Sequence, residues 1–435
     1  MSSTGIRAFA ASAPSNKFPK FTDGDTRIVI SSSKQYHLHS SILRMHSTSF
    51  AAALVPEHAA ALSKKAEKEG INTRFHLELD RESDLTTGQR ALILVQQLNY
   101  KVVALDDYAR PLHHSNLLPD IENGRVPDPV YGHYDTVLRA LYNQPPTLNE
   151  TDIGAILREA MGLIEIAENL SCVSVIAPAV GIALTNQGQT LYKAIATNPI
   201  AWVNLSARIN CKAIFKEALI NIVGRYNVIS KGPQCNTMTP KILELVTRKH
   251  QELVKMCRSA ESRMHGHYPR HVMRNEGQDC GRASYSNDIL SWMALCAFRH
   301  WLGQIINYDK NFRGTDGGYE LYNSISIGGN AYLTRAVMEN FHSKFHMSRK
   351  CQGVLENHLN FLKEDLKQFV EPLMKCNLQV DRNSFEVKWL ACTEVRPTDY
   401  PWMASALEGA AAGAEERSEE VCGEEVEEEE EDVSN

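Results

Sequence analysis

The chain has 435 residues, of which 43% are hydrophobic and 23% charged, and this is the profile of a globular protein with room for two domains. Because no run reaches about 18 apolar residues, the sequence predicts no transmembrane helix and no membrane partner. Residues 1–22 lack a continuous apolar stretch, which favours a disordered N-terminal arm over a secretory signal. A mitochondrial presequence is the alternative, since no acidic residue precedes Asp23.

The net charge of −6 is concentrated near the C-terminus. Residues 415–432 hold eleven Glu and Asp432 against Arg417 alone, so the rest of the chain is positively charged. With little to bury, residues 406–435 are predicted to form a disordered acidic tail. The tail is interpreted as a solubilising extension, as a ligand for a basic partner such as a histone, or as a segment that folds back on the basic body. Its charge repels nucleic acid, so direct nucleic-acid binding is not expected.

The ten cysteines form no CxxC pair and are widely spaced. A disulfide framework or a structural zinc site usually needs closer or paired cysteines. The pattern is typical of reduced thiols in a cytoplasmic or nuclear protein, and no cofactor is expected.

The first ordered segment reads as two strands followed by a helix. Strand patterns at 27–30 and 36–39 flank a Ser-rich turn, which predicts a hairpin. Ser40 or Ser41 is predicted to cap a helix that runs to about Leu54. Alternation at 74–79 predicts a third strand.

This order and its residues resemble the opening of a BTB/POZ domain. The residues that carry the resemblance are Asp25, Ile28, Val29, Ile30, Tyr36, His39, Ile42, Leu43, Ser47 and Phe50. A second block also resembles the family: a helix at 134–142 that ends in Leu-Tyr, and a helical hairpin at 156–184 with its bend at Ser171 and Cys172. The resemblance implies an α/β (α+β) BTB/POZ-like N-terminal domain over residues 23–186.

Two features depart from the family pattern. Ser40 stands where the family commonly has Lys or Arg, and residues 81–130 form a long insertion. Residues 92–95 and 100–104 of this insertion are interpreted as extra strands, or as a strand and a short helix. Alternatively, residues 89–100 are themselves the helix that ends in Leu-Tyr. The whole arrangement resembles a group of BTB proteins from filamentous fungi that lack Kelch, MATH or zinc-finger domains.

Residues 187–405 are predicted to form an all-α C-terminal domain. Two or three short helices are expected at 187–226, and longer ones at 240–259, 286–306 and 350–374. The apolar stripe of the last helix is interpreted as intramolecular core, with a coiled-coil seam as the alternative. Alternation of Phe385, Val387 and Trp389 predicts a short strand.

The sequence contains few groups that suggest chemistry. Five His and Cys residues are the candidate zinc ligands: Cys257, His265, His267, His271 and Cys280. Their spacing belongs to no common closed site, so a solvated basic loop is preferred. The glycines at 314–318 and 327–329 lack the rest of a phosphate-binding motif and are predicted to be turns. No catalytic or metal-binding residue is therefore assigned, and an enzyme is not expected, although a metallohydrolase is a remaining alternative.

The predicted function is non-enzymatic protein–protein interaction, with self-association through the first strand and helix as its mode. The interaction candidates are Asp25, Ile28, Tyr36, His39, Ile42, Leu43 and Phe50. Protein partners are expected, with a homodimer and a cullin-type ubiquitin ligase as candidates. The alternatives are a substrate adaptor of such a ligase, which the resemblance implies for some family members, and a nuclear transcription or chromatin scaffold that uses the acidic tail.

Overall fold

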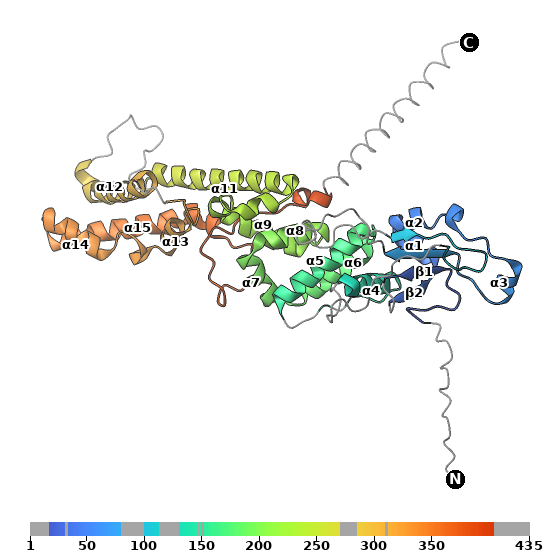
Figure 1. Ribbon diagram of the computed structural model, residues 1–435. Helices are drawn as coiled ribbons and strands as arrows, with labels where there is room; N and C mark the ends of the chain where they lie inside the picture. Colours follow the sequence, from blue (N-terminus) through green and yellow to red (C-terminus); the bar gives the residue numbers. More distant parts are fainter. Residues whose placement is uncertain are drawn as a thin grey trace, which may run out of the picture. The chain divides into compact units, whose positions relative to one another are not determined.

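The computed structural model describes residues 17–30, 34–79, 100–112, 130–146, 148, 152–269, 285–308 and 312–403 (Figure 1). The chain divides into two compact units, Met1–Gln187 and Gly188–Asn435. The first combines a small sheet with helices, and the described part of the second is helical with irregular connections. The expected order, an α+β region followed by an all-helical region, is confirmed at this level. Within the described residues, no helix is both long enough and apolar enough to cross a membrane.

The sheet of the first unit has four strands in the order β2-β1-β3-β4. These are β1 (Thr26–Val29), β2 (Gln35–Leu38), β3 (Phe75–Leu79) and β4 (Tyr100–Val102). The first pair is antiparallel, as expected for a hairpin, while β3 runs parallel to β1 and antiparallel to β4. The predicted third strand and the strand at 100–104 are therefore confirmed. Residues 80–99, which include the expected strand at 92–95 and nearly all of the alternative helix, lie outside the described residues.

The predicted helix after the hairpin is two helices, α1 (Ser40–His46) and α2 (Thr48–Ala53). Ser47 separates them, because its hydroxyl accepts the Phe50 N–H at 3.0 Å and donates to the Leu170 carbonyl at 2.5 Å. The expectation that Ser40 or Ser41 caps the helix is wrong. His39 holds the N-cap position, and the Asp25 carboxylate accepts the Ser40 N–H at 2.6 Å in place of a local cap.

Three longer helices complete the first unit: α4 (Val130–Leu141), α5 (Ile153–Asn169) and α6 (Val173–Thr185). They pack on one another, with apolar residues of all three buried in the contact. The bend between α5 and α6 lies where the sequence predicted it, and Ser171 there has a φ of 49°. Short elements connect the strands: the 3-10 helix η1 (Pro56–His58) and α3 (Lys64–Lys68).

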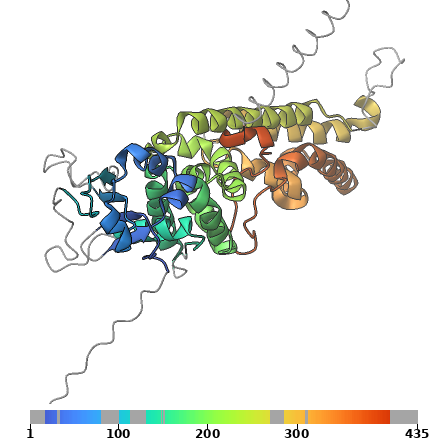
Figure 2. The same ribbon diagram turned by 90° about the vertical axis from the view of Figure 1, so that its right-hand side faces the viewer.

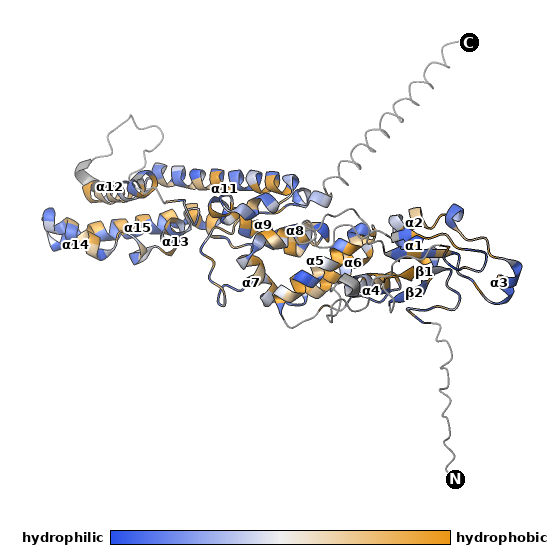
Figure 3. Ribbon diagram, in the orientation of Figure 1, coloured by the Kyte–Doolittle hydropathy of each residue, from blue (hydrophilic) through white to orange (hydrophobic). Residues whose placement is uncertain are grey.

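The helical unit begins with α7 (Gln189–Thr197), α8 (Pro199–Arg208) and α9 (Lys212–Gly224). Almost every residue of α9 is buried, so this helix is the centre of its core, and α7 and α8 pack against it. Figure 3 shows α8 and α9 as largely hydrophobic. The short α10 (Tyr226–Ile229) and the 3-10 helix η2 (Pro233–Thr237) lead to the long helix α11 (Pro240–Gly266). The start predicted at 240 is confirmed, and the helix extends beyond the expected end at 259.

The remaining helices are α12 (Tyr285–Tyr308), α13 (Tyr319–Ile327), α14 (Arg335–Lys344) and α15 (Arg349–Met374), with the 3-10 helix η4 (Gly329–Ala331) between α13 and α14. Helix α15 packs against α11, α12 and α13 (Figure 1 and Figure 2). The inner stripe of α15 is buried, which confirms its interpretation as intramolecular core. Turns fill residues 312–318, and Gly317, Gly318 and Gly328 have positive φ, as the glycine-rich stretches predicted.

A buried ionic cluster joins α11 to α13. Arg313 donates to both carboxylate oxygens of Glu261, at 2.5 and 2.6 Å, and the Tyr322 hydroxyl donates to the same group at 2.6 Å. Because a buried carboxylate needs such partners to offset its lost hydration, this cluster specifies how the two helices meet.

The chain after α15 has no regular structure until the 3-10 helix η5 (Pro397–Asp399), so the strand predicted at 385–389 is wrong. Val387 and Trp389 are nevertheless buried, in a cluster with Ile220 of α9. Earlier in the same segment, the Glu217 side chain of α9 accepts the N–H groups of Gln379 and Val380 at 2.8 and 3.2 Å. Alternating burial therefore arises here from packing on a helix.

Candidate interaction sites

Four of the seven residues predicted to bind a partner are buried inside the first unit. Ile28, Tyr36, Leu43 and Phe50 are each 3% exposed or less. The Tyr36 hydroxyl donates to Asp135 of α4 at 2.8 Å, which joins the sheet to that helix. Burial raises the pKa of Tyr36 far above its ordinary value, so the hydroxyl keeps its proton. These four side chains stabilise the fold and offer no surface to a partner.

The other three predicted residues are half-buried. Asp25 binds Ser40 through both its carboxylate oxygens. The His39 backbone N–H donates to the Tyr142 hydroxyl at 2.8 Å, and the His39 ring lies 3.3 Å from Asp23. Of the seven, Ile42 is thus the apolar side chain that a partner can reach in part. The seven residues lie in or beside β1, β2, α1 and α2.

The sheet topology bears on self-association through the first strand. Strand β1 lies inside the sheet, between β2 and β3, so its backbone groups are already paired. The outer edge of β2 is partly covered, because His37 exchanges backbone hydrogen bonds with Pro19 and Phe21. Edge pairing at β1 would therefore require a strand to leave the sheet.

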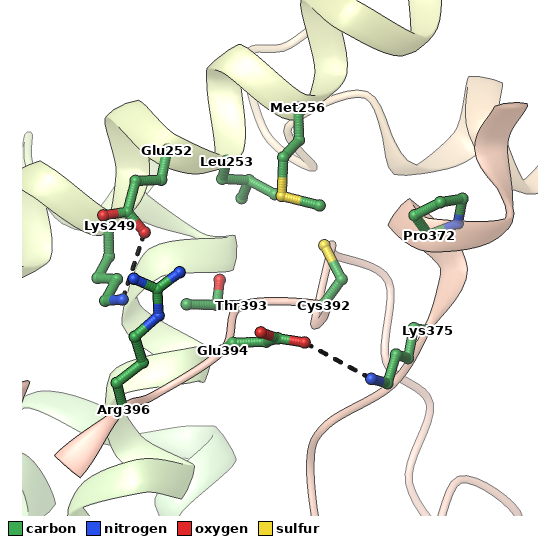
Figure 4. Close-up of a pocket in the computed structure, with 10 residues that line it drawn as sticks. All are labelled: Lys249, Glu252, Leu253, Met256, Pro372, Lys375, Cys392, Thr393, Glu394 and Arg396. Atoms are coloured by element: carbon green, nitrogen blue, oxygen red, sulfur yellow. Dashed lines mark hydrogen bonds and ion pairs between the residues drawn. The ribbon is translucent and has the colours of Figure 1, made fainter.

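In the helical unit, a cleft of about 320 Å³ lies beside α11 (Figure 4). Its walls come from the middle of α11, the end of α15 and the irregular segment that follows. The lining residues are Lys249, Glu252, Leu253, Met256, Pro372, Lys375, Cys392, Thr393, Glu394 and Arg396. The floor is apolar and the rim carries both signs of charge.

The charges at the rim are partly paired. Lys249 is buried, with its ammonium 2.8 Å from Asp399 and 3.3 Å from Glu252. Lys375 lies 3.7 Å from Glu394 at the opposite end of the cleft, and both of these side chains are exposed. Figure 4 shows Arg396 at the Lys249 end. The cleft therefore combines apolar walls with charged side chains of both signs.

The thiol of Cys392 does not make this cleft a catalytic site. Burial raises the pKa of Cys392 to about 12, so the thiol is protonated at neutral pH and is a poor nucleophile. The sequence did not indicate this cleft, because its α11 residues are more than a hundred positions from the other residues that form it. The alternating burial pattern at 385–389 was the sole local sign that the segment packs on the helical unit.

Exposed apolar side chains are frequent on α14 and α15. They are Val337 in α14, Phe345 directly after that helix, and Val354 and Phe361 in α15, and Phe361 is 71% exposed. Val354 and Phe361 are seven residues apart and so lie on one side of α15, away from its buried stripe. Phe345 stacks on Phe341 at 4.9 Å between ring centroids. Aromatic side chains are enriched in protein–protein interfaces relative to the rest of the protein surface.

The candidate zinc ligands are not assembled by the described residues. His267 lies 3.4 Å from Asp365 and its ring meets Phe369, so α15 accounts for its position. Cys257 is buried, and burial raises its pKa to about 11. His271 and Cys280 lie outside the described residues. Within the described ranges, no three or more His, Cys, Asp or Glu side chains are placed to hold a metal ion.

Comparison with known proteins gives one result. The family model of the FF domain, in its fungal form, matches residues 269–372. The match begins just after α11 and ends within α15, so it covers α12 to α14 and most of α15. No curated protein and no solved structure matches the chain.

The BTB/POZ resemblance is therefore wrong: the family match is an FF domain, in a different part of the chain. The resemblance depended on the order strand, turn, strand, helix and on isolated residues such as Tyr36 and His39. In this structure those residues pack the core and connect neighbouring elements. Residues in any small α+β unit can have this role, so it does not identify a family. The FF match covers residues 269–372, where the sequence predicted helices but no family.

Proposed function

We propose that this chain is a non-catalytic protein-interaction protein, whose helical unit binds a partner protein through the exposed apolar side chains of α14 and α15. The observation that carries the proposal is the FF-domain match over residues 269–372, since FF domains in general are protein-interaction modules.

The arrangement of α15 supports the proposed surface. Its inner residues, from Leu355 to Leu373, fix the helix on the rest of the unit. Phe361 projects from another side of the helix and remains exposed. An aromatic side chain on a rigid helix loses little conformational freedom on binding and buries a large area, so it is a strong anchor for a partner.

The sequence also predicted self-association, with adaptor function and a chromatin scaffold as alternatives. Self-association stays a prediction, and the exposed face of α15 offers it a surface that β1 does not. Adaptor function for a cullin-type ligase was inferred from the BTB/POZ resemblance and has lost that support. A chromatin scaffold depends on the acidic tail, which lies outside the described residues, and a cytoplasmic or nuclear location stays a prediction with it.

The test is affinity capture of the full-length chain from its own cells, with quantitative mass spectrometry. Phe361→Asp should remove proteins that the unaltered chain captures, because it places a charge in the proposed contact. Val228→Asp is the matched control, since Val228 is an exposed apolar residue of α10 outside the FF match. If both variants capture the same proteins as the unaltered chain, the proposed surface is wrong.

A further inference from the structure

The solvent-facing side of α11 carries a row of basic side chains. The exposed ones along this row are Lys241, Arg248, Lys255 and Arg258. The first three are spaced by seven residues, or about two turns, so they project from one side of the helix. Fewer acidic residues are exposed on α11, namely Glu244 and Glu252, so the face has a net positive charge. Figure 3 shows the hydrophilic residues that run along this helix.

Much of this charge has no counterion. Among the described residues, Lys241, Lys255 and Arg258 make no ion pair, while Arg248 binds Asp399 at 2.7 Å. The cleft of Figure 4 lies on the neighbouring side of α11, where Lys249, Leu253 and Met256 form one of its walls. At the cleft, Arg396 adds a further cation without an acidic partner among the described residues. A basic row thus adjoins an apolar hollow.

The described chain ends on this face. Asp399 is held by Arg248 and Lys249 of α11, and Tyr400 and Trp402 pack on Phe215 of α9. The last described residue is Met403. Eleven residues, 404–414, separate it from the acidic segment, and they span up to about 36 Å when extended. The row from Lys241 to Arg258 is about 25 Å long, so the acidic segment can reach all of it.

We propose that residues 415–432 of this chain bind the basic face of α11 and the cleft beside it. The Glu side chains neutralise the row, and Val421 and Val426, which interrupt the acidic run, suit the apolar floor at Leu253 and Met256. Tethering favours this occupant over an acidic segment of another protein, because the short connection gives it a high effective concentration at the face.

The test is zero-length carbodiimide coupling of the full-length chain, which joins a carboxylate directly to a lysine amine. Mass spectrometry should place the products between residues 415–432 and three lysines, namely Lys241, Lys255 and Lys375. Their yield should fall severalfold at about 0.5 M salt, where screening shortens the range of charge attraction. Equal coupling to exposed lysines elsewhere, such as Lys231, would overturn the proposal.

Two further experiments test whether charge attraction drives the coupling and whether the coupling occurs within one copy of the chain. Combined Arg258→Glu and Arg396→Glu leaves every lysine in place, so a fall of about threefold or more in coupling to Lys255 and Lys375 would report lost attraction. Lys231→Glu, on the turn after α10, should leave those yields unchanged. In a mixture of labelled and unlabelled copies, products within one copy support the proposal. Products that join two copies would overturn it in favour of docking between chains.

Discussion

The ammonium of Lys249 lies 2.8 Å from the Asp399 carboxylate, and the two side chains are only 3% and 4% exposed. Arg248 binds the same carboxylate at 2.7 Å, and the Arg396 backbone N–H donates to it at 2.8 Å. A carboxylate buried this deeply is tolerated because its partners replace its hydration. Asp399 therefore joins α11 to the last part of the described chain.

Removing this carboxylate should destabilise the helical unit. Asp399→Asn leaves the Lys249 ammonium with Glu252 as its remaining partner, and we expect the free energy of unfolding to fall by about 3 kcal/mol. Urea denaturation measures the change. As a control, Glu339→Gln breaks the exposed pair between Arg335 and Glu339 and should cost less than about 0.5 kcal/mol. Similar small losses in both variants would show that the Lys249–Asp399 contact is not formed.

Gly224 tests the contact between α9 and the irregular segment. A Cβ at this position would lie 2.3 Å from the Leu390 carbonyl oxygen and 2.6 Å from the Trp389 ring. Gly224→Ala should therefore destabilise the protein by about 1–3 kcal/mol, because backbone must move to admit the methyl group. Gly353→Ala in α15 is the control, since nothing lies within 4 Å, and it should stabilise by about 0.5–1 kcal/mol. Thermal or urea unfolding of both variants measures the two changes in stability. If both changes have the same sign, this packing is contradicted.

Glu217 makes stability depend on pH. Burial raises the pKa of Glu217 above its ordinary value, although the Gln379 and Val380 N–H groups act in the opposite direction. The folded chain therefore binds this proton more tightly than the unfolded chain does. The group's stabilising contribution is present below the ordinary carboxyl pKa of about 4.3 and is lost as pH rises through the raised value.

Glu217→Gln removes this titration while keeping an oxygen that can accept one of the N–H groups. The free energy of unfolding of the unaltered chain, relative to that of the variant, should decrease between about pH 4 and about pH 7. Urea titrations of both chains at the two pH values measure it. A difference that stays constant or increases would contradict the raised pKa.

Substitutions at two adjacent residues of α15 should differ strongly in their effect on stability. Leu362 is 1% exposed and Phe361 is 71% exposed. Leu362→Ala should lower the free energy of unfolding by about 2–5 kcal/mol, because it leaves a cavity in the core. Phe361→Asp should change it by about 0.5 kcal/mol or less, as an exposed site does. Chemical denaturation of the two variants checks the orientation of the helix, and the reverse ranking would show that α15 is rotated.

Local patterns in the sequence predicted most of the elements. The hairpin at β1 and β2 and the stripe of α15 are visible as periods of two and of 3–4 residues, and both form as expected. The single helix expected at 40–54 is divided, because Ser47 bonds to Leu170, far away in sequence. The predicted strand at 385–389 failed for the same kind of reason, since alternating burial on a helix and alternating burial in a sheet look alike in sequence.

The candidate sites were less predictable. Tyr36 and His39 were selected because they match a motif, and the structure uses them to hold the sheet to α4 and to Tyr142. Phe361 was hidden beside the apolar stripe of α15, and its outward direction depends on which side the other helices pack. The cleft beside Lys249 needs the 392–399 segment to return to α11, and no local pattern encodes that return.

The most direct test of the proposed interaction surface is a photo-reactive phenylalanine analogue at position 361 of the full-length chain, illuminated in living cells. The account predicts a covalent adduct with another protein or with a second copy of the chain, and no adduct from the same analogue at position 228. No adduct from position 361, or equal adducts from both positions, would contradict the claim that the exposed face of α15 binds a protein partner.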